Sequence, residues 1–200
     1  MLPFGKPMLA PYRKAKAFQG VFYTSVLMPA GLTAEHVEKT MEHTLKTFVA
    51  INQGLITEEL PPISEVIQSN SYSGLLHGVA TNLLARFSEF EKTKDTEFPD
   101  LKHPKTGCGL EVKTTSSKSP WSTFGHNPGS GWYIDFEFDI AEGLPDFSKT
   151  WVGELSEEDF TVRERAETSK RTRTASVKKE SWDEKMNKVF EREGNTSFVH

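Results

Sequence analysis

Apolar residues recur at helical spacing in two stretches of the N-terminal half of the chain. The more regular stretch has apolar side chains at Leu75, Leu76, Val79, Ala80, Leu83, Leu84 and Phe87. This spacing produces one wide apolar face and predicts a helix that packs flat on a sheet. The earlier stretch, residues 33–52, predicts another helix, with Thr33 as its N-cap and Gly54 as its stop.

Strict alternation of apolar and polar residues predicts a strand over residues 131–140, GWYIDFEFDI. One face carries Trp132, Ile134, Phe136, Phe138 and Ile140, and the other carries Tyr133, Asp135, Glu137 and Asp139. We interpret the acidic face as a solvent-facing surface, with a contribution to a second metal site as the alternative. Residues 20–28, 150–155 and 159–164 predict further strands. Near the C-terminus, Ser181 and Glu184 have capping-box spacing ahead of a helix whose apolar face is Trp182, Met186, Val189 and Phe190.

The segment between the second helix and the clear strand reads as a hairpin. A short strand starts at Asp100, a turn lies near residues 105–107, and a longer strand runs through Lys113. The order helix, helix, hairpin, strands, helix predicts an α/β fold with a mixed central β-sheet flanked by helices. We expect one domain over residues 1–200, made of an N-terminal helical part (1–69), a core (70–155) and a C-terminal part of strands, basic segment and helix (156–200).

Composition agrees with a single intracellular domain. The chain has 200 residues, of which 36% are hydrophobic, enough for a real core. Its only cysteine, Cys108, excludes an internal disulfide framework and fits a reducing compartment. The proline-broken first 20 residues lack an apolar stretch of signal-peptide type, and no segment reaches the length of a membrane span. We therefore expect a cytoplasmic protein of a prokaryote or virus with no membrane partner.

Charge changes this picture only locally. The formal net charge of −4 argues against a strongly basic coating for nucleic acid. It leaves room for a local basic cleft, because the distribution of charge decides where a polyanion binds.

The hairpin carries the most distinctive group of charged residues. In a strand, side chains alternate between faces, so Glu111 and Lys113 project from one side about 7 Å apart while Val112 points into the core. Asp100 brings a second carboxylate from the preceding strand. The alternatives are an ordinary ion pair on an exposed strand for Glu111 and Lys113, and a turn residue for Asp100.

The pattern Pro99-Asp100, ten intervening residues, then Glu111-Val112-Lys113 resembles the signature of the PD-(D/E)xK nuclease superfamily, best known from restriction endonucleases. The amphipathic helix before the hairpin resembles that superfamily's core, and the resemblance covers roughly residues 70–155. It implies a restriction-endonuclease-like core and a catalytic set of Asp100, Glu111 and Lys113.

The resemblance also implies Mg²⁺ as the cofactor, and this ion prefers oxygen ligands. Asp100, Glu111 and the carbonyl of Val112 would supply them. The metal would lower the pKa of a bound water and polarise the scissile phosphate. Lys113 would orient that water and stabilise negative charge in the transition state.

Two segments are candidates for DNA contact. The hydroxyl-rich loop after Lys113 holds polar and aromatic side chains that donate to phosphates and base edges: Lys118, Trp121, His126 and Asn127. The basic run over residues 163–179 offers phosphate contacts at Lys170, Arg171 and Arg173. A plain surface loop and a solvated hairpin are the respective alternatives.

From these residues we expect a Mg²⁺-dependent type II restriction endonuclease that hydrolyses double-stranded DNA at a short specific site. By resemblance it would act as a homodimer, and the helix at 33–52 is the candidate dimerisation element. The alternatives are a repair, homing or phage nuclease with the same catalytic residues, or a DNA-binding module with a non-catalytic site. In a third alternative, a small-molecule enzyme or interaction protein, Glu-Val-Lys would be only structural.

Overall fold

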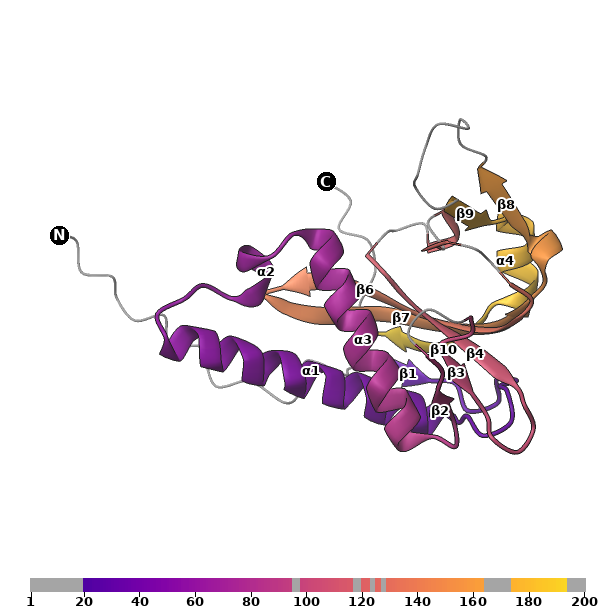
Figure 1. Cartoon of the computed structure of the whole chain (residues 1–200), viewed down its shortest axis with the longest axis horizontal. Helices are drawn as coiled ribbons and strands as arrows, with labels where there is room; N and C mark the ends of the chain where they lie inside the picture. Colours follow the sequence, from indigo (N-terminus) through magenta and orange to yellow (C-terminus); the bar gives the residue numbers. More distant parts are fainter. Residues whose placement is uncertain are drawn as a thin grey trace.

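The computed structural model describes residues 20–94, 98–116, 120–122, 125–126, 129–163 and 174–193. Within these ranges the strands form a seven-stranded sheet and a separate three-stranded sheet (Figure 1). The larger sheet has the order β1-β10-β7-β6-β4-β3-β2. Its strands are β1 (Gly20–Phe22), β2 (Glu91–Lys92), β3 (Leu101–Lys102), β4 (Gly109–Thr115), β6 (Gly131–Ala141), β7 (Leu144–Leu155) and β10 (Asn187–Arg192).

The larger sheet is mixed. Strands β4 and β6 run parallel, with Glu111 beside Tyr133 and Lys113 beside Asp135, while the other neighbours pair antiparallel. Parallel neighbours cannot be joined by a tight hairpin, so the chain must return after β4 to the end of the sheet at which β4 began before it can start β6. The predicted α/β class with a mixed central sheet is confirmed.

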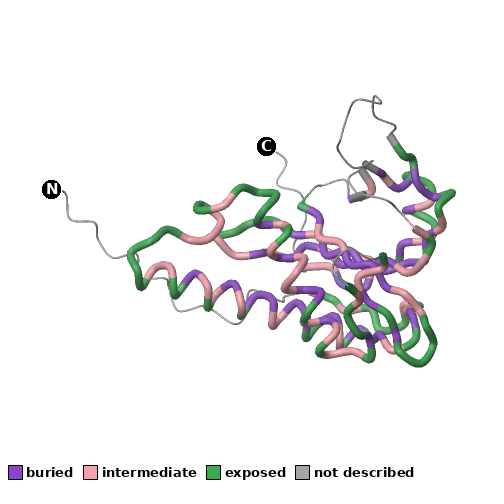
Figure 2. The backbone as a smooth tube through the Cα atoms, viewed as in Figure 1, coloured by how far each residue is buried: buried purple, intermediate pink, exposed green. Residues whose placement is uncertain are grey.

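Helices α1 (Ala34–Thr57) and α3 (Ser69–Phe87) lie along one face of this sheet, and the short α2 (Ile63–Val66) connects them (Figure 1). Their apolar sides form the main core with inward residues of the strands, among them Val37, Met41, Phe48, Leu76, Leu84, Val112, Ile134 and Phe136. Figure 2 shows buried residues recurring along the inner sides of both helices and through the strands. The helical face predicted over 75–87 is thus the face that covers the sheet.

The opposite face of β6 and β7 is covered by a second layer. This layer consists of the small sheet, with β5 (Gly125–His126), β8 (Phe160–Arg163) and β9 (Thr174–Val177), and of α4 (Lys179–Lys185). Its core contains Tyr133, Leu155, Phe160, Ala175, Val177, Trp182 and Met186. Two short 3₁₀ turns, Pro120–Ser122 and Glu157–Asp159, complete the described elements.

The predicted start of α1 is confirmed, but its predicted stop is wrong. The Thr33 side chain does accept a hydrogen bond from His36 N–H, as an N-cap should. However, α1 continues through Gly54 to Thr57 and ends where Glu59 adopts a positive φ of 59°. Gly54 has open space around it and only weakens the helix there, and Leu55 and Ile56 behind it are still half-buried.

The predicted C-terminal helix is only partly present. Helix α4 begins at Lys179 and ends at Lys185, so Ser181 lies inside it and does not cap it. Val189 and Phe190 belong to β10, a strand enclosed between β1 and β7. Pairing on both sides outweighs the helical spacing of the apolar residues, because tertiary burial overrides a local pattern.

The interpretation of the acidic face of 131–140 as solvent-facing is wrong for its central residues. Tyr133 is 1% exposed and Asp135 is 0% exposed. Tyr133 lies in the core of the second layer, and of the acids on this face only Asp139, at the far end of the strand, is exposed. Alternation by itself could not distinguish water from another layer of protein.

Among the described helices, none is long and apolar enough to cross a membrane.

Candidate functional site

The hairpin of β3 and β4 places Asp100 next to the start of β4. Leu101 pairs with Leu110, so Asp100 and Glu111 lie at adjacent positions of the two strands. Two glycines permit this: Gly107 takes a φ of 73° in the turn, and a Cβ at Gly109 would collide with the Pro99 ring. The predicted hairpin, with its turn near 105–107, is confirmed.

Reciprocal hydrogen bonds join Asp100 to the Glu-Val-Lys segment. The Val112 N–H donates to Asp100 Oδ2 at 2.9 Å, and the Asp100 N–H donates to Glu111 Oε2 at 3.1 Å. Each acidic residue is therefore held by a main-chain donor of the other strand. Asp100, Glu111 and Val112, the three predicted metal ligands, do come together.

Lys113 lies against the same pair of strands. Its Nζ donates to Glu111 Oε1 at 2.5 Å, and the two side chains are 20% and 12% exposed. The predicted common side of Glu111 and Lys113 is confirmed, whereas the alternative of an exposed ion pair is not, because both groups are largely buried. Such a pair needs its hydrogen bonds to offset desolvation.

His77 joins this cluster from α3 and was missed in the sequence. Its Nε2 lies 3.2 Å from Asp100 Oδ2 and 3.1 Å from the Val112 carbonyl oxygen. Both partners are acceptors, so Nε2 carries the proton. The available signal was a polar residue beside Leu76 within the apolar pattern of α3, on the helix that precedes Asp100.

One turn before His77, Ser73 ties α3 to the same strand. Ser73 Oγ lies 3.3 Å from the Thr114 carbonyl and 3.2 Å from Thr114 Oγ1, which in turn lies 3.2 Å from the Ser73 carbonyl. Together with His77, this contact fixes the position of α3 along β4.

The environment of Asp100 favours its ionised form. Burial opposes ionisation, but the hydrogen bonds from His77 and the Val112 N–H, together with the nearby charge of Lys113, outweigh it. The pKa of Asp100 therefore lies below its ordinary value. Asp100 is an acceptor carboxylate at neutral pH, as a metal ligand must be.

The donor set fits a hard divalent cation. No group of three His, Cys, Asp or Glu side chains suited to a metal is present among the described residues. Mg²⁺ does not require one, because it binds through one or two carboxylates and completes its octahedron with waters and phosphate oxygens. Two carboxylates and the Val112 carbonyl meet that requirement, and the 24% exposure of the Asp100 side chain leaves the site accessible.

Most predicted DNA contacts lie outside the described residues, namely Lys118, Asn127, Lys170, Arg171 and Arg173. The main chain of His126 pairs with Thr174 in the small sheet. The centre of the Trp121 ring lies 6.4 Å from the centre of the Trp182 ring and 5.4 Å from Lys179 Nζ. Trp121 therefore has a packing role in the second layer, and its contact with DNA stays a prediction.

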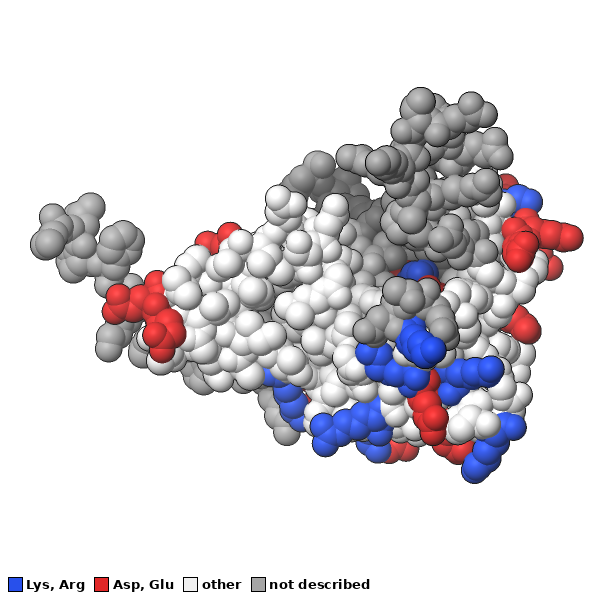
Figure 3. Space-filling view, in the orientation of Figure 1, with Lys and Arg blue, Asp and Glu red and all other residues white. Residues whose placement is uncertain are grey.

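Charge is unevenly distributed over the face that Figure 3 shows. Lys and Arg gather over the β2–β3–β4 edge, whereas the surface over α2 and the first half of α3 is mostly uncharged. Lys92, Lys102 and Lys105 are exposed at this edge, with Glu91 among them. The edge beside the candidate site is thus the basic part of this view, although its lysines alternate with acids.

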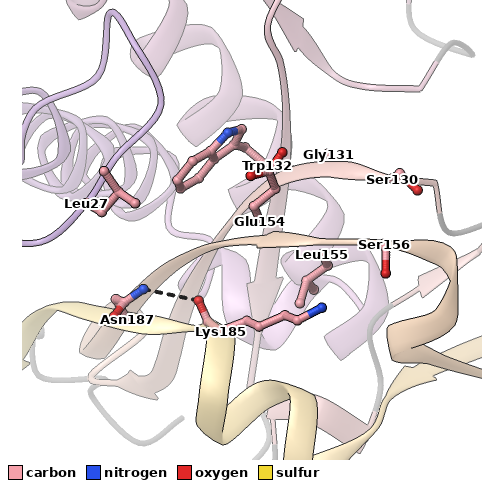
Figure 4. Close-up of a pocket in the computed structure, with 9 residues that line it drawn as sticks. All are labelled: Leu27, Ser130, Gly131, Trp132, Glu154, Leu155, Ser156, Lys185 and Asn187. Atoms are coloured by element: carbon pink, nitrogen blue, oxygen red, sulfur yellow. Dashed lines mark hydrogen bonds between the residues drawn. The ribbon is translucent and has the colours of Figure 1, made fainter.

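The cavity in Figure 4 is a separate feature. It has a volume of about 520 Å³ and lies where β6 starts and β7 ends, with Leu27, Trp132, Glu154 and Lys185 among its lining residues. None of Asp100, Glu111, Lys113 or His77 lines it. Lys185 is engaged with Asp159 at 2.7 Å, and Glu154, the other charged residue of the lining, is exposed.

No protein-family model matches the chain, and no curated protein is significantly similar to it.

Proposed function

We propose that this protein is a Mg²⁺-dependent endodeoxyribonuclease of PD-(D/E)xK type, and specifically a type II restriction endonuclease. The observation that carries the proposal is the meeting of Asp100, Glu111, Lys113 and the Val112 carbonyl at one accessible place. These groups come from two strands and supply oxygen ligands beside a cation, as metal-assisted phosphodiester hydrolysis requires.

Each residue has a definite task in this proposal. Asp100, Glu111 and the Val112 carbonyl would hold the cation, which would supply an activated water and polarise the scissile phosphate. Lys113 would orient the attacking water and neutralise charge that develops on the phosphate. His77 would keep the Asp100 carboxylate and the Val112 carbonyl oriented, since one N–H contacts both.

Supercoiled plasmid incubated with the purified protein and Mg²⁺ tests the proposal. We expect discrete fragments in Mg²⁺ and intact plasmid in EDTA or in Ca²⁺. A smear would indicate a non-specific nuclease, and a gel shift without cutting would indicate a binding module.

Asp100→Asn provides the matched variant, since it keeps the shape of the side chain and removes its charge. Cleavage that persists in Asp100→Asn would come from a contaminating nuclease or another site. Intact plasmid under all conditions, with no gel shift, would contradict the proposal.

A further inference from the structure

Asp135 is a buried carboxyl group next to the candidate site with one oxygen unaccounted for. It lies at the centre of β6 and is 0% exposed. Thr115 Oγ1 donates to its Oδ1 at 2.8 Å. Its Oδ2 is buried and has no hydrogen-bond partner among the described residues. An unpaired buried carboxyl oxygen is unfavourable, so its retention calls for a reason.

The groups around Asp135 identify the partner that this oxygen could take. Lys113 lies directly beside Asp135 in the register of β4 and β6, and Trp151 lies beside it on β7. Other titratable groups nearby on the same face are Glu111, Tyr133, Glu137 and Lys149. Trp151 Nε1 donates to Glu137, so Glu137 is already engaged. The cation adjacent to the unpaired oxygen is Lys113.

In the structure, Lys113 is paired with Glu111 and not with Asp135. Its ammonium donates to Glu111 Oε1, one of the oxygens that a divalent cation would require. A cation bound to Glu111 would repel the ammonium and compete for the same oxygen. Neighbouring strands are about 4.8 Å apart, and the register sets Lys113 opposite Asp135, so the two side chains are direct neighbours across the strands.

We propose that Asp135 is a positioning residue that receives the Lys113 ammonium when Glu111 binds the divalent cation. This inference rests on the proposed metal-dependent function. Glu111 and Lys113 are paired with each other before the cation binds; after it binds, Glu111 is paired with the cation and Lys113 with Asp135. It holds Lys113 at a fixed distance from the metal and leaves Glu111 free to act as a ligand.

Calorimetric titration with Ca²⁺ in the absence of DNA tests the proposal without relying on catalysis. Four proteins are compared: wild type, Asp135→Asn, Lys113→Met and the double variant. We expect Asp135→Asn to bind Ca²⁺ about tenfold more weakly, because the displaced lysine then has no carboxylate to receive it. In the Lys113→Met background, the same Asp135→Asn change should have no effect.

Asp139→Asn is the matched control, since Asp139 is an exposed acid on the same strand, and its Ca²⁺ affinity should equal that of the wild type. Equal affinity of wild type and Asp135→Asn would overturn the inference and leave the nuclease proposal standing. So would an equal loss in both backgrounds, which would show an effect independent of Lys113. No Ca²⁺ binding by the wild type would overturn the metal site itself, and the inference with it.

A crystal structure of the wild type with Ca²⁺ gives a second measurement that does not depend on the stability of any variant. We expect Lys113 Nζ within hydrogen-bond distance of Asp135 Oδ2 and away from Glu111. An ammonium that still donates to Glu111 beside the bound cation would overturn the inference.

Discussion

Strands β4 and β6 meet α1 and α3 on one face through Leu110, Val112, Ile134 and Phe136, all 0% exposed. The other face of the same two strands carries Glu111, Lys113, Tyr133 and Asp135, which are also largely buried. Both faces are covered by protein, yet one is apolar and closely packed while the other holds charges and an unpaired oxygen.

The two faces contribute differently to the free energy of folding. Burial of apolar side chains against the helices supplies the free energy of folding. Burial of Glu111, Lys113 and Asp135 opposes folding unless every charge is paired. These charges are the ones that the proposed function uses. The predictions below compare substitutions on the two faces, from the largest expected effect to the smallest.

The largest effect is expected on the polar face, in activity. Asp100→Ala and Glu111→Ala should each reduce cleavage by about 10³-fold or more, because loss of the metal removes several kcal/mol of transition-state stabilisation. DNA binding in Ca²⁺ should be largely retained. Plasmid cleavage rates and gel shifts measure the two quantities. Asp139→Ala is the control and should cut like the wild type. Wild-type turnover in Asp100→Ala or in Glu111→Ala would refute the assignment.

On the helix-facing side the expected effect is on stability. Phe136 is fully buried and its ring lies 6.0 Å from that of Phe147. Phe136→Ala should lower the free energy of unfolding by about 3–5 kcal/mol, because it leaves a cavity in the core. Urea unfolding measures this, with Ile140→Ala as the control, since Ile140 is 44% exposed on the same strand. Equal losses in both variants would mean that the two positions do not differ in packing.

The third effect concerns the pH dependence of stability. Burial, opposed by the Thr115 hydrogen bond, raises the pKa of Asp135 from 3.8 to about 7. The folded state therefore binds a proton between these values that the unfolded state has released. The stabilisation from Asp135 is fully present below pH 4 and is lost as the pH rises through 7.

The size of this loss is at most about 4 kcal/mol, at about 1.4 kcal/mol for each pH unit between the two pKa values. Urea unfolding of the wild type at pH 5 and pH 8 should show a decrease that Asp135→Asn largely removes. Asp139→Asn should retain the decrease. If the wild type and Asp135→Asn respond identically to pH, Asp135 does not titrate in this range.

The smallest effect is expected where α3 and β4 are joined by polar contacts. Ser73→Ala removes its contacts with the Thr114 carbonyl and hydroxyl and should cost about 1 kcal/mol of unfolding free energy. Thermal unfolding measures the loss, and Ser71→Ala, an exposed serine of the same helix, is the control. A loss above about 3 kcal/mol would mean that the contact acts through more than its hydrogen bonds.

The candidate site was predictable to the extent that its residues lie close together in the chain. Asp100, Glu111 and Lys113 belong to one hairpin, so strand alternation and a short turn were enough to predict their proximity. His77 could not be predicted in the same way, because its approach to Asp100 and Val112 depends on how α3 crosses the sheet. The proposed DNA contacts at Lys118, Asn127 and 170–173 stay predictions.

Local periodicity in the sequence determined the two long helices, the hairpin and the strand at 131–140, because these patterns reflect backbone geometry within each segment. Only the tertiary structure decided that Val189 and Phe190 form a strand inside the sheet and that the Tyr133 side of β6 is buried against a second layer. Both outcomes depend on segments far apart in the sequence: β10 pairs with β7 and β1, and α4 with the small sheet covers β6. The sequence of a strand records that its faces differ, but what covers each face is decided by the rest of the chain.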